Sequence, residues 1–301
     1  MIRGKSLVCC FAALAFCVGA LGDTKAPQSK LTAAEIVEKN VAARGGLQAW
    51  RAVTALAYAG EMEAGGNSRP SLPVPELKRG TELPPSRPTE QVKLPFVMDL
   101  QRSHKARVEI QFNGKTAIQV FDGATGWKLR PFLNRMEVEP YTAEEMKAAS
   151  TQEELDGPLV DYAAKGTKLE FDGMEKVEGH DTYKIKLTMK NGNSIHVWID
   201  VETFLEAKME GTPRRLDGQY HPVEIFLRDY RATDGLMIPY VVETHVLPIK
   251  GVAGFRETTE KVAIDRVTVN PKFADSLFAK PQIMVGTNSK QAPAAGGHSL
   301  P

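Results

Sequence analysis

Cysteine is scarce in this chain. Of its 301 residues only three are cysteines, and Cys9, Cys10 and Cys17 all lie within the first 22 residues. That segment has the layout of a secretory signal peptide, so its removal would leave a chain without cysteine. Disulfide bonds, thiol catalysis and cysteine-bound metal are therefore excluded for the mature protein.

The segment 1–22 supplies each part of an export signal. Arg3 and Lys5 give a basic start, an apolar stretch follows, and small residues precede a cleavage point near Gly22. The apolar stretch is too short for a membrane span, so we expect release into the periplasm. Phe16 is too bulky for a lipoprotein processing site, which makes lipidation at Cys17 the lesser alternative.

An excess of charge of one sign is also lacking. The chain has 38 basic and 37 acidic residues, a net charge of +1, and loss of the segment 1–22 removes two cations and no acid, which gives −1. A nucleic-acid binder shows a basic excess or stripe. Nucleic acid is therefore not an expected partner.

Motifs for catalysis and for metal or cofactor binding are missing as well. The six histidines are scattered without ligand spacing, and neither Gly-x-Ser-x-Gly nor a glycine-rich phosphate loop occurs. The acid pairs Glu144-Glu145 and Glu153-Glu154 are explained by positions at helix starts. We expect no catalytic residue, no metal site and no cofactor, with a hydrolase whose site is not recognisable as the less favoured alternative.

The first secondary-structure element after the signal segment is predicted to be a helix that lies on a sheet. Thr32 and Glu35 fit a capping box, and Gly45-Gly46 ends the apolar periodicity. A short turn carrying Trp50 follows. Prolines then crowd the sequence up to residue 95, and we interpret 64–95 as a surface insertion, either an irregular loop or a partner-binding arm.

Two meanders of alternating strands follow, separated by helical sequence. Asn113-Gly114 and Asp122-Gly123 mark turns of the first meander, and Asn191-Gly192 and Asp234-Gly235 those of the second. Between the meanders, 142–166 carries helix signals: capping boxes at Thr142/Glu145 and Thr151/Glu154, and Pro158 in the first turn of a further helix. Roughly ten strands in one sheet would curl or close. From about residue 285 the composition indicates a disordered tail.

The segment 121–132, Phe-Asp-Gly-Ala-Thr-Gly-Trp-Lys-Leu-Arg-Pro-Phe, resembles the central motif of the LolA/LolB-like periplasmic lipoprotein carriers. The chain end from Asn270-Pro271-Lys272-Phe273 to Pro281 is similar to theirs. Segments 43–47 and 156–159 also resemble a broader group of secreted proteins of this fold. The proline-rich insertion and the longer mature domain depart from the family pattern.

The resemblance implies an α+β fold: a strongly curved antiparallel sheet, or incomplete β-barrel, with helices covering its concave face. It implies one domain over 23–284 and non-covalent binding of lipid or lipoprotein acyl chains in an apolar cavity. Partners would be such acyl chains, an envelope protein donor or acceptor, and, transiently, a membrane surface. An envelope sensor of the same fold that binds lipid or protein is the alternative, and a structural module a further one.

Candidate ligand-binding residues are apolar strand positions for the cavity wall and three residues of the helical insertion for a lid. Ordinary core packing would explain the same residues, and alternation does not say which sheet face is concave. The candidates are Val108, Ile110, Phe112, Ile118, Val120, Trp127 and Leu129 for the wall, and Leu155, Leu159 and Tyr162 for the lid.

Overall fold

The computed structural model describes residues 30–65, 91–131, 135–151, 155–216, 218–252 and 255–282. The predicted signal segment, most of the proline-rich insertion, Glu153-Glu154 with their capping box, and the predicted tail lie outside these residues. Within them the chain forms one antiparallel sheet of thirteen strands and a few helices.

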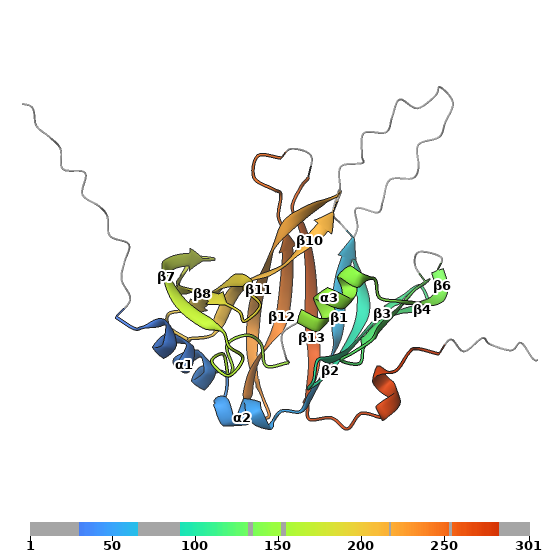
Figure 1. The fold of residues 1–301 in the computed structure, drawn as a ribbon, viewed down its shortest axis with the longest axis horizontal. Helices are drawn as coiled ribbons and strands as arrows, with labels where there is room; N and C mark the ends of the chain where they lie inside the picture. The colour runs from blue at the N-terminus through green and yellow to red at the C-terminus, as the bar shows by residue number, and fades with distance from the viewer. Residues whose placement is uncertain are drawn as a thin grey trace, which may run out of the picture.

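The strands follow one another along the sheet except at one junction. The order is β6-β5-β4-β3-β2-β1-β13-β12-β11-β10-β9-β8-β7, so the first and last strands of the chain meet in the middle (Figure 1). Their bounds are β1 Ala55–Gly65, β2 Gln91–Gln101, β3 Lys105–Phe112, β4 Lys115–Phe121, β5 Gly126–Arg130, β6 Arg135–Pro140, β7 Lys168–Val177, β8 His180–Thr188, β9 Ser194–Asp200, β10 Glu206–Leu216, β11 Gln219–Thr233, β12 Leu236–Val246 and β13 Thr258–Val269.

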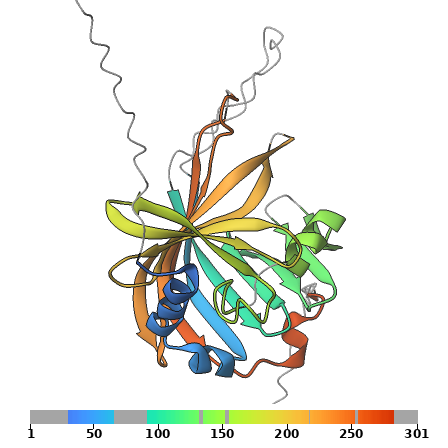
Figure 2. The same ribbon diagram turned by 60° about the vertical axis from the view of Figure 1, so that its left-hand side comes forward.

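The prediction of a strongly curved sheet or incomplete β-barrel was wrong: the sheet is neither closed nor strongly curled. Its two edges, β6 and β7, do not pair with each other. Pairing of β1 with β13 places the two meanders side by side and leaves these strands at opposite edges. Figure 2 shows the resulting twisted, open sheet with α1 (Ala33–Ala43) and α2 (Leu47–Ala52) against one side.

Local signals in the sequence predicted several elements correctly. Thr32 and Glu35 form the expected capping box at the start of α1, and Thr142 and Glu145 form the same arrangement at α3 (Ala143–Thr151). The Asn-Gly and Asp-Gly turns occur where predicted, with positive φ at each of their glycines and also at Asn113 and Asp234; Asn113, for example, has φ 48°. Pro158, by contrast, does not begin a helix, because 155–166 is a series of turns.

The proline-rich insertion is shorter than predicted, because β2 begins at Gln91 and includes Pro95. Pro95 pairs with Glu61 of β1 but lies just beyond the last pair between β2 and β3, Phe96 with Ile110. Its missing N–H therefore removes no hydrogen bond to β3. β7 was also missed, since a register shift between Phe171 and Met174 interrupts its alternation.

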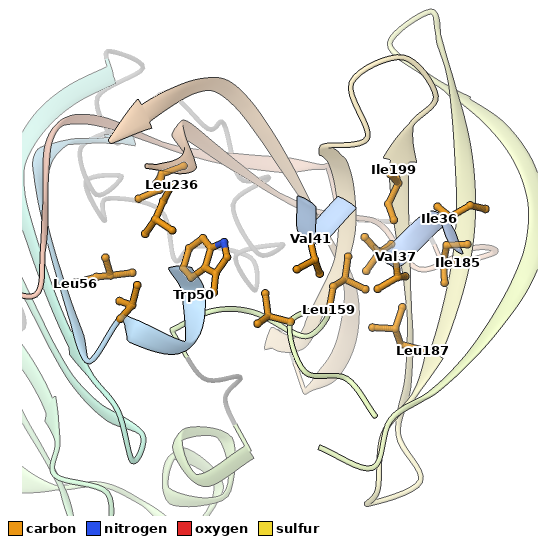
Figure 3. Packing of buried hydrophobic residues seen from close by; sticks show 14 of the residues in the cluster. Ile36, Val37, Val41, Trp50, Leu56, Leu159, Ile185, Leu187, Ile199 and Leu236 are labelled. Carbon is orange, nitrogen blue, oxygen red and sulfur yellow. The ribbon is translucent and has the colours of Figure 1, made fainter. Parts of the chain in front are cut away.

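The main core cluster lies on one face of the sheet, which we call the inner face. Buried residues of α1, α2 and 155–166 pack there against β8, β9, β12, β13 and β1 (Figure 3). Trp50 and Leu159 are almost completely buried in this cluster, at 1% and 0% exposed. The helices therefore fill the inner face over this half of the molecule, which we call the filled half.

Candidate functional site

The inner face continues from the filled half onto β2, β3 and β4. Residues paired across an antiparallel sheet point to the same side, so the register identifies which side chains share this face. One such row crosses five strands through Leu227, Val242, Val262, Met62 and Leu94. A second row runs from Tyr58 through Met98 to Val108, and a third pairs Phe96 with Ile110.

We call the apolar side chains of these rows the inner-face strip. Apart from Phe96, which is 8% exposed, they are half-buried rather than buried, and Val242 and Val262 also pack against the core of the filled half, where the strip begins. The strip consists of Met62, Leu94, Phe96, Met98, Val108, Ile110, Leu227, Val242 and Val262.

The inner face is buried at one end of the strands and exposed at the other, beyond the two ends of the strip. At the end near α2, Leu56 and Phe121 are 0% and 3% exposed. At the opposite end, Val92 and Phe112 are 45% and 37% exposed. The strip therefore opens toward the end of the sheet where β1 stops and β2 starts.

A hollow of about 460 Å³ lies at this open end. The start of β2 and the β3–β4 hairpin line it, and Leu94 belongs both to the hollow and to the strip. Its lining residues are Val92, Lys93, Leu94, Pro95, Gln111, Phe112, Asn113, Gly114, Lys115 and Thr116. The hollow therefore has a mixed polar and apolar lining and adjoins the strip at Leu94.

Helix α3 lies over the inner face and is attached to both halves of the sheet (Figure 1). Glu145 pairs with the buried Lys128 of β5, and Glu144 pairs with Arg215 of β10 at 3.4 Å. Burial raises the pKa of Glu145, but the hydrogen bonds from Lys128 and Thr142 outweigh it and leave that pKa below its usual value. α3 is thus held by two ion pairs, and none of its described side chains belongs to the buried core cluster that contains residues of α1 and α2.

The predicted lid residues Leu155, Leu159 and Tyr162 belong to the filled half. Leu159 is a core residue, and the other two pack against the core. The segment is fixed by Asp156, whose carboxylate pairs with Arg102 at 2.9 Å and with Lys165 at 2.7 Å. Because this segment is part of the core, α3 is the better candidate for a movable cover.

Two segments noted in the sequence, 43–47 and 156–159, meet beneath this core. Arg44 Nη1 donates to the backbone oxygen of Asp156 at 3.0 Å and to Glu206 at 3.2 Å, and its guanidinium stacks on Trp50. Arg44 is 8% exposed. These contacts join α1, α2, 155–166 and β10, which indicates a structural role for both segments.

Tyr58 is the polar group of the strip's second row. Burial, with a smaller effect from Tyr240, raises its pKa to about 12 against the opposing charge of Arg44, so its hydroxyl stays protonated at neutral pH. No residue in the described part of the chain hydrogen-bonds to that hydroxyl. Tyr58 can therefore donate a hydrogen bond to a polar group of a ligand on the inner face.

The predicted wall residues do not lie on one surface. Val108, Ile110 and Phe112 belong to the inner face, but Val108 pairs with Gln119 and Ile110 with Ala117. The remaining four, Ile118, Val120, Trp127 and Leu129, therefore point to the outer face. There Lys280 lies over the Trp127 ring, with Nζ 4.4 Å from its centroid.

Seven strip residues were not among the candidates from sequence. They come from β1, β2 and the second meander: Met62, Leu94, Phe96, Met98, Leu227, Val242 and Val262. Alternation in the sequence marks several of them as facing one side of a strand. The pairing of β1 with β13, which brings them beside β3, has no local signal.

Two further properties bear on function. In the described ranges, no helix is long and apolar enough to cross a membrane. Among the same residues, histidines and acids form no group of three or more that could hold a metal ion.

No family model and no curated protein matches the sequence. Solved structures that resemble this one include a LolA superfamily protein from Nitrosomonas europaea, 12% identical, over 83% of this chain and 98% of that chain with a TM-score of 0.48. A Vibrio parahaemolyticus domain named for outer membrane lipoprotein sorting is 12% identical over 82% and 96%, with a TM-score of 0.48. A DUF1329 family protein from Desulfovibrio piger is 12% identical over 82% and 97%, also with a TM-score of 0.48. At this identity, the similarity identifies no ligand or activity for this chain.

Proposed function

We propose that this protein binds the acyl chains of a lipid or lipoprotein on its inner-face strip and carries them through the periplasm. The observation that supports the proposal most is the strip itself. It is a continuous apolar surface on the core side of the sheet, and most of its side chains are left half-exposed by the helices.

Energetics favour this use of the strip. Exposing acyl chains to water costs about 0.8 kcal/mol per methylene, so a carrier must shield them during transfer. The strip contains two methionines, Met62 and Met98, whose flexible side chains adapt to chains of irregular shape, and Phe96, whose ring gives a flat apolar surface. The proposed mechanism has no covalent step and needs no catalytic residue.

Release of the ligand requires a cover that can move, and α3 is proposed for this role. Its ion pairs, Glu145 with Lys128 and Glu144 with Arg215, join it to β5 and β10. Partly exposed ion pairs contribute about 1 kcal/mol or less each. Open and closed positions of α3 would then differ by only a few kcal/mol, as a carrier requires. The proposed donor and acceptor are envelope proteins or a membrane surface contacted transiently.

The test is to purify the mature protein from a bacterial periplasm without detergent and to record its native mass before and after organic extraction. We expect a stoichiometric lipid mass that extraction removes. Ile110→Glu places a charge on the strip and should abolish this mass. Ile118→Glu is the matched control, because Ile118 is also half-buried but lies on the outer face of the neighbouring strand.

Thermal unfolding of both variants separates ligand loss from unfolding. If Ile110→Glu does not fold, Val108→Trp fills the strip without adding a charge and should also displace the lipid. An unchanged protein mass before extraction and after addition of lipids or lipopeptides would refute acyl-chain binding. Equal lipid loss in Ile110→Glu and Ile118→Glu would refute the assignment to the inner face.

A further inference from the structure

Large apolar side chains are exposed mainly where the central strands end, along the border of the sheet that runs across the strands and not along the edge strands β6 and β7. Four of the five that are most exposed in the described residues lie there: Val92 at 45%, Phe112 at 37%, Tyr220 at 60% and Val252 at 43%. Pairing of Gly65 with Gln91 and of Val246 with Thr258 marks this edge as the common end of the central strands. We call these four residues the apolar edge.

The connection between β12 and β13, which carries Val252, rises from this edge in Figure 1, and its Phe255 ring lies 4.0 Å from the ring of His221 near the start of β11. β11 also carries Tyr220, while Val92 and Phe112 border the hollow at the end of the strip. Val92 and Phe112 therefore border the proposed point of ligand entry, which is this hollow, and Tyr220 and Val252 lie at the same end of other strands.

Exposed cations accompany the apolar side chains. Lys115, Lys250 and Arg256 form no hydrogen bond or ion pair with any residue that the structure describes. Lys93 pairs only with Glu61, at 3.3 Å, and both side chains remain largely exposed. Of the acids nearby, Glu257 is already paired with His245. The edge thus offers free positive charge beside exposed apolar groups.

From this combination we infer that the apolar edge docks on a lipid bilayer that contains anionic phospholipids. Apolar side chains can enter the headgroup region while lysine and arginine contact lipid phosphates. The inference rests on the proposed lipid binding, for which it names the surface of lipid exchange. Docking in this orientation places the hollow against the bilayer, and a lipid could then reach the strip without crossing water.

Flotation of the full mature chain with vesicles tests the inference. We expect binding to vesicles of phosphatidylglycerol and phosphatidylethanolamine, weaker binding as salt is raised, and little binding to phosphatidylcholine alone. The double variant Lys250→Glu/Arg256→Glu should weaken binding at least about tenfold. Arg266→Glu/Lys272→Glu is the matched control, since both exposed cations lie at the other end of β13.

The apolar contribution is tested separately. Phe112→Ser/Val252→Ser should weaken vesicle binding, whereas Met136→Ser, which removes the fifth exposed apolar side chain from β6, should not. Equal weakening by edge and control variants would overturn the inference.

Failure of docking and failure of lipid binding are distinguishable. A chain that retains lipid in its native mass but does not float with anionic vesicles overturns docking alone and points to a protein partner at this edge. A chain that carries no lipid and takes none up, yet floats through the same four residues, refutes the proposed function and supports the edge as a membrane contact.

Discussion

The two halves of the inner face have similar strands but different covers. In the filled half, α1, α2 and 155–166 bury side chains such as Leu187 and Ile199 completely. In the strip, Met98 and Ile110 also point inward but stay half-buried, and the helix over this side of the sheet, α3, is held by ion pairs to β5 and β10. Apolar alternation therefore does not separate a core from a binding surface; the packing of the covering elements does.

The largest difference between the halves is expected for loss of a large side chain. Trp50→Ala should destabilise the fold by about 3 to 5 kcal/mol, because Trp50 is buried and its Nε1 donates to the oxygen of Arg44. Met98→Ala in the strip should cost only about 1 kcal/mol, since water can occupy the space. Chemical denaturation of both variants measures the difference. Similar losses would show that the strip is ordinary core.

Within the filled half, loss of a buried ion pair should have an almost equally large effect. Asp156→Ala leaves Arg102 and Lys165 without their carboxylate in the filled half and should cost about 3 kcal/mol. Asp161→Ala removes the more exposed pair with Arg51 from the same segment and should cost about 1 kcal/mol or less. A mild effect of Asp156→Ala, measured by denaturation, would mean that 155–166 is held loosely and could itself act as a lid.

The smallest effect concerns the attachment of α3. Because the pKa of Glu145 is lowered in the folded protein, its contribution to stability is present above its ordinary value of 4.5 and is lost as the pH falls through the lowered pKa. We expect faster amide hydrogen exchange in α3 at acidic pH, relative to α1. Glu145→Gln should make exchange in α3 fast at neutral pH too, by an amount worth less than about 1 kcal/mol. If the rate of amide exchange in α3 relative to that in α1 did not change as the pH is lowered, this role for Glu145 would be contradicted.

Features decided within a few residues could be predicted from the sequence. The capping box at Thr32 and the turns at Asn113-Gly114 and Asp234-Gly235 depend on local backbone geometry and are observed. The open shape of the sheet and the pairing of β1 with β13 depend on residues about two hundred positions apart, for which the sequence has no local signal.

The division of the wall residues between two faces was nevertheless present in the sequence. A two-residue turn at Asn113-Gly114 pairs Phe112 with Lys115, and counting back from that pair sets Ile110 opposite Ala117. Ile118 must then face the other side. Alternation within each strand was used in the prediction, but the register between strands, which the turn also fixes, was not.

The most direct test of the difference between the halves is methyl NMR of the delipidated protein, with isoleucine, leucine, valine and methionine methyl groups labelled, during titration with a lipid. We predict shift changes at Met62, Met98 and Ile110 of the strip, and none at Leu187 or Leu159 of the filled half. Shift changes confined to outer-face residues such as Ile118, or no change at any methyl group of the strip, would contradict the account.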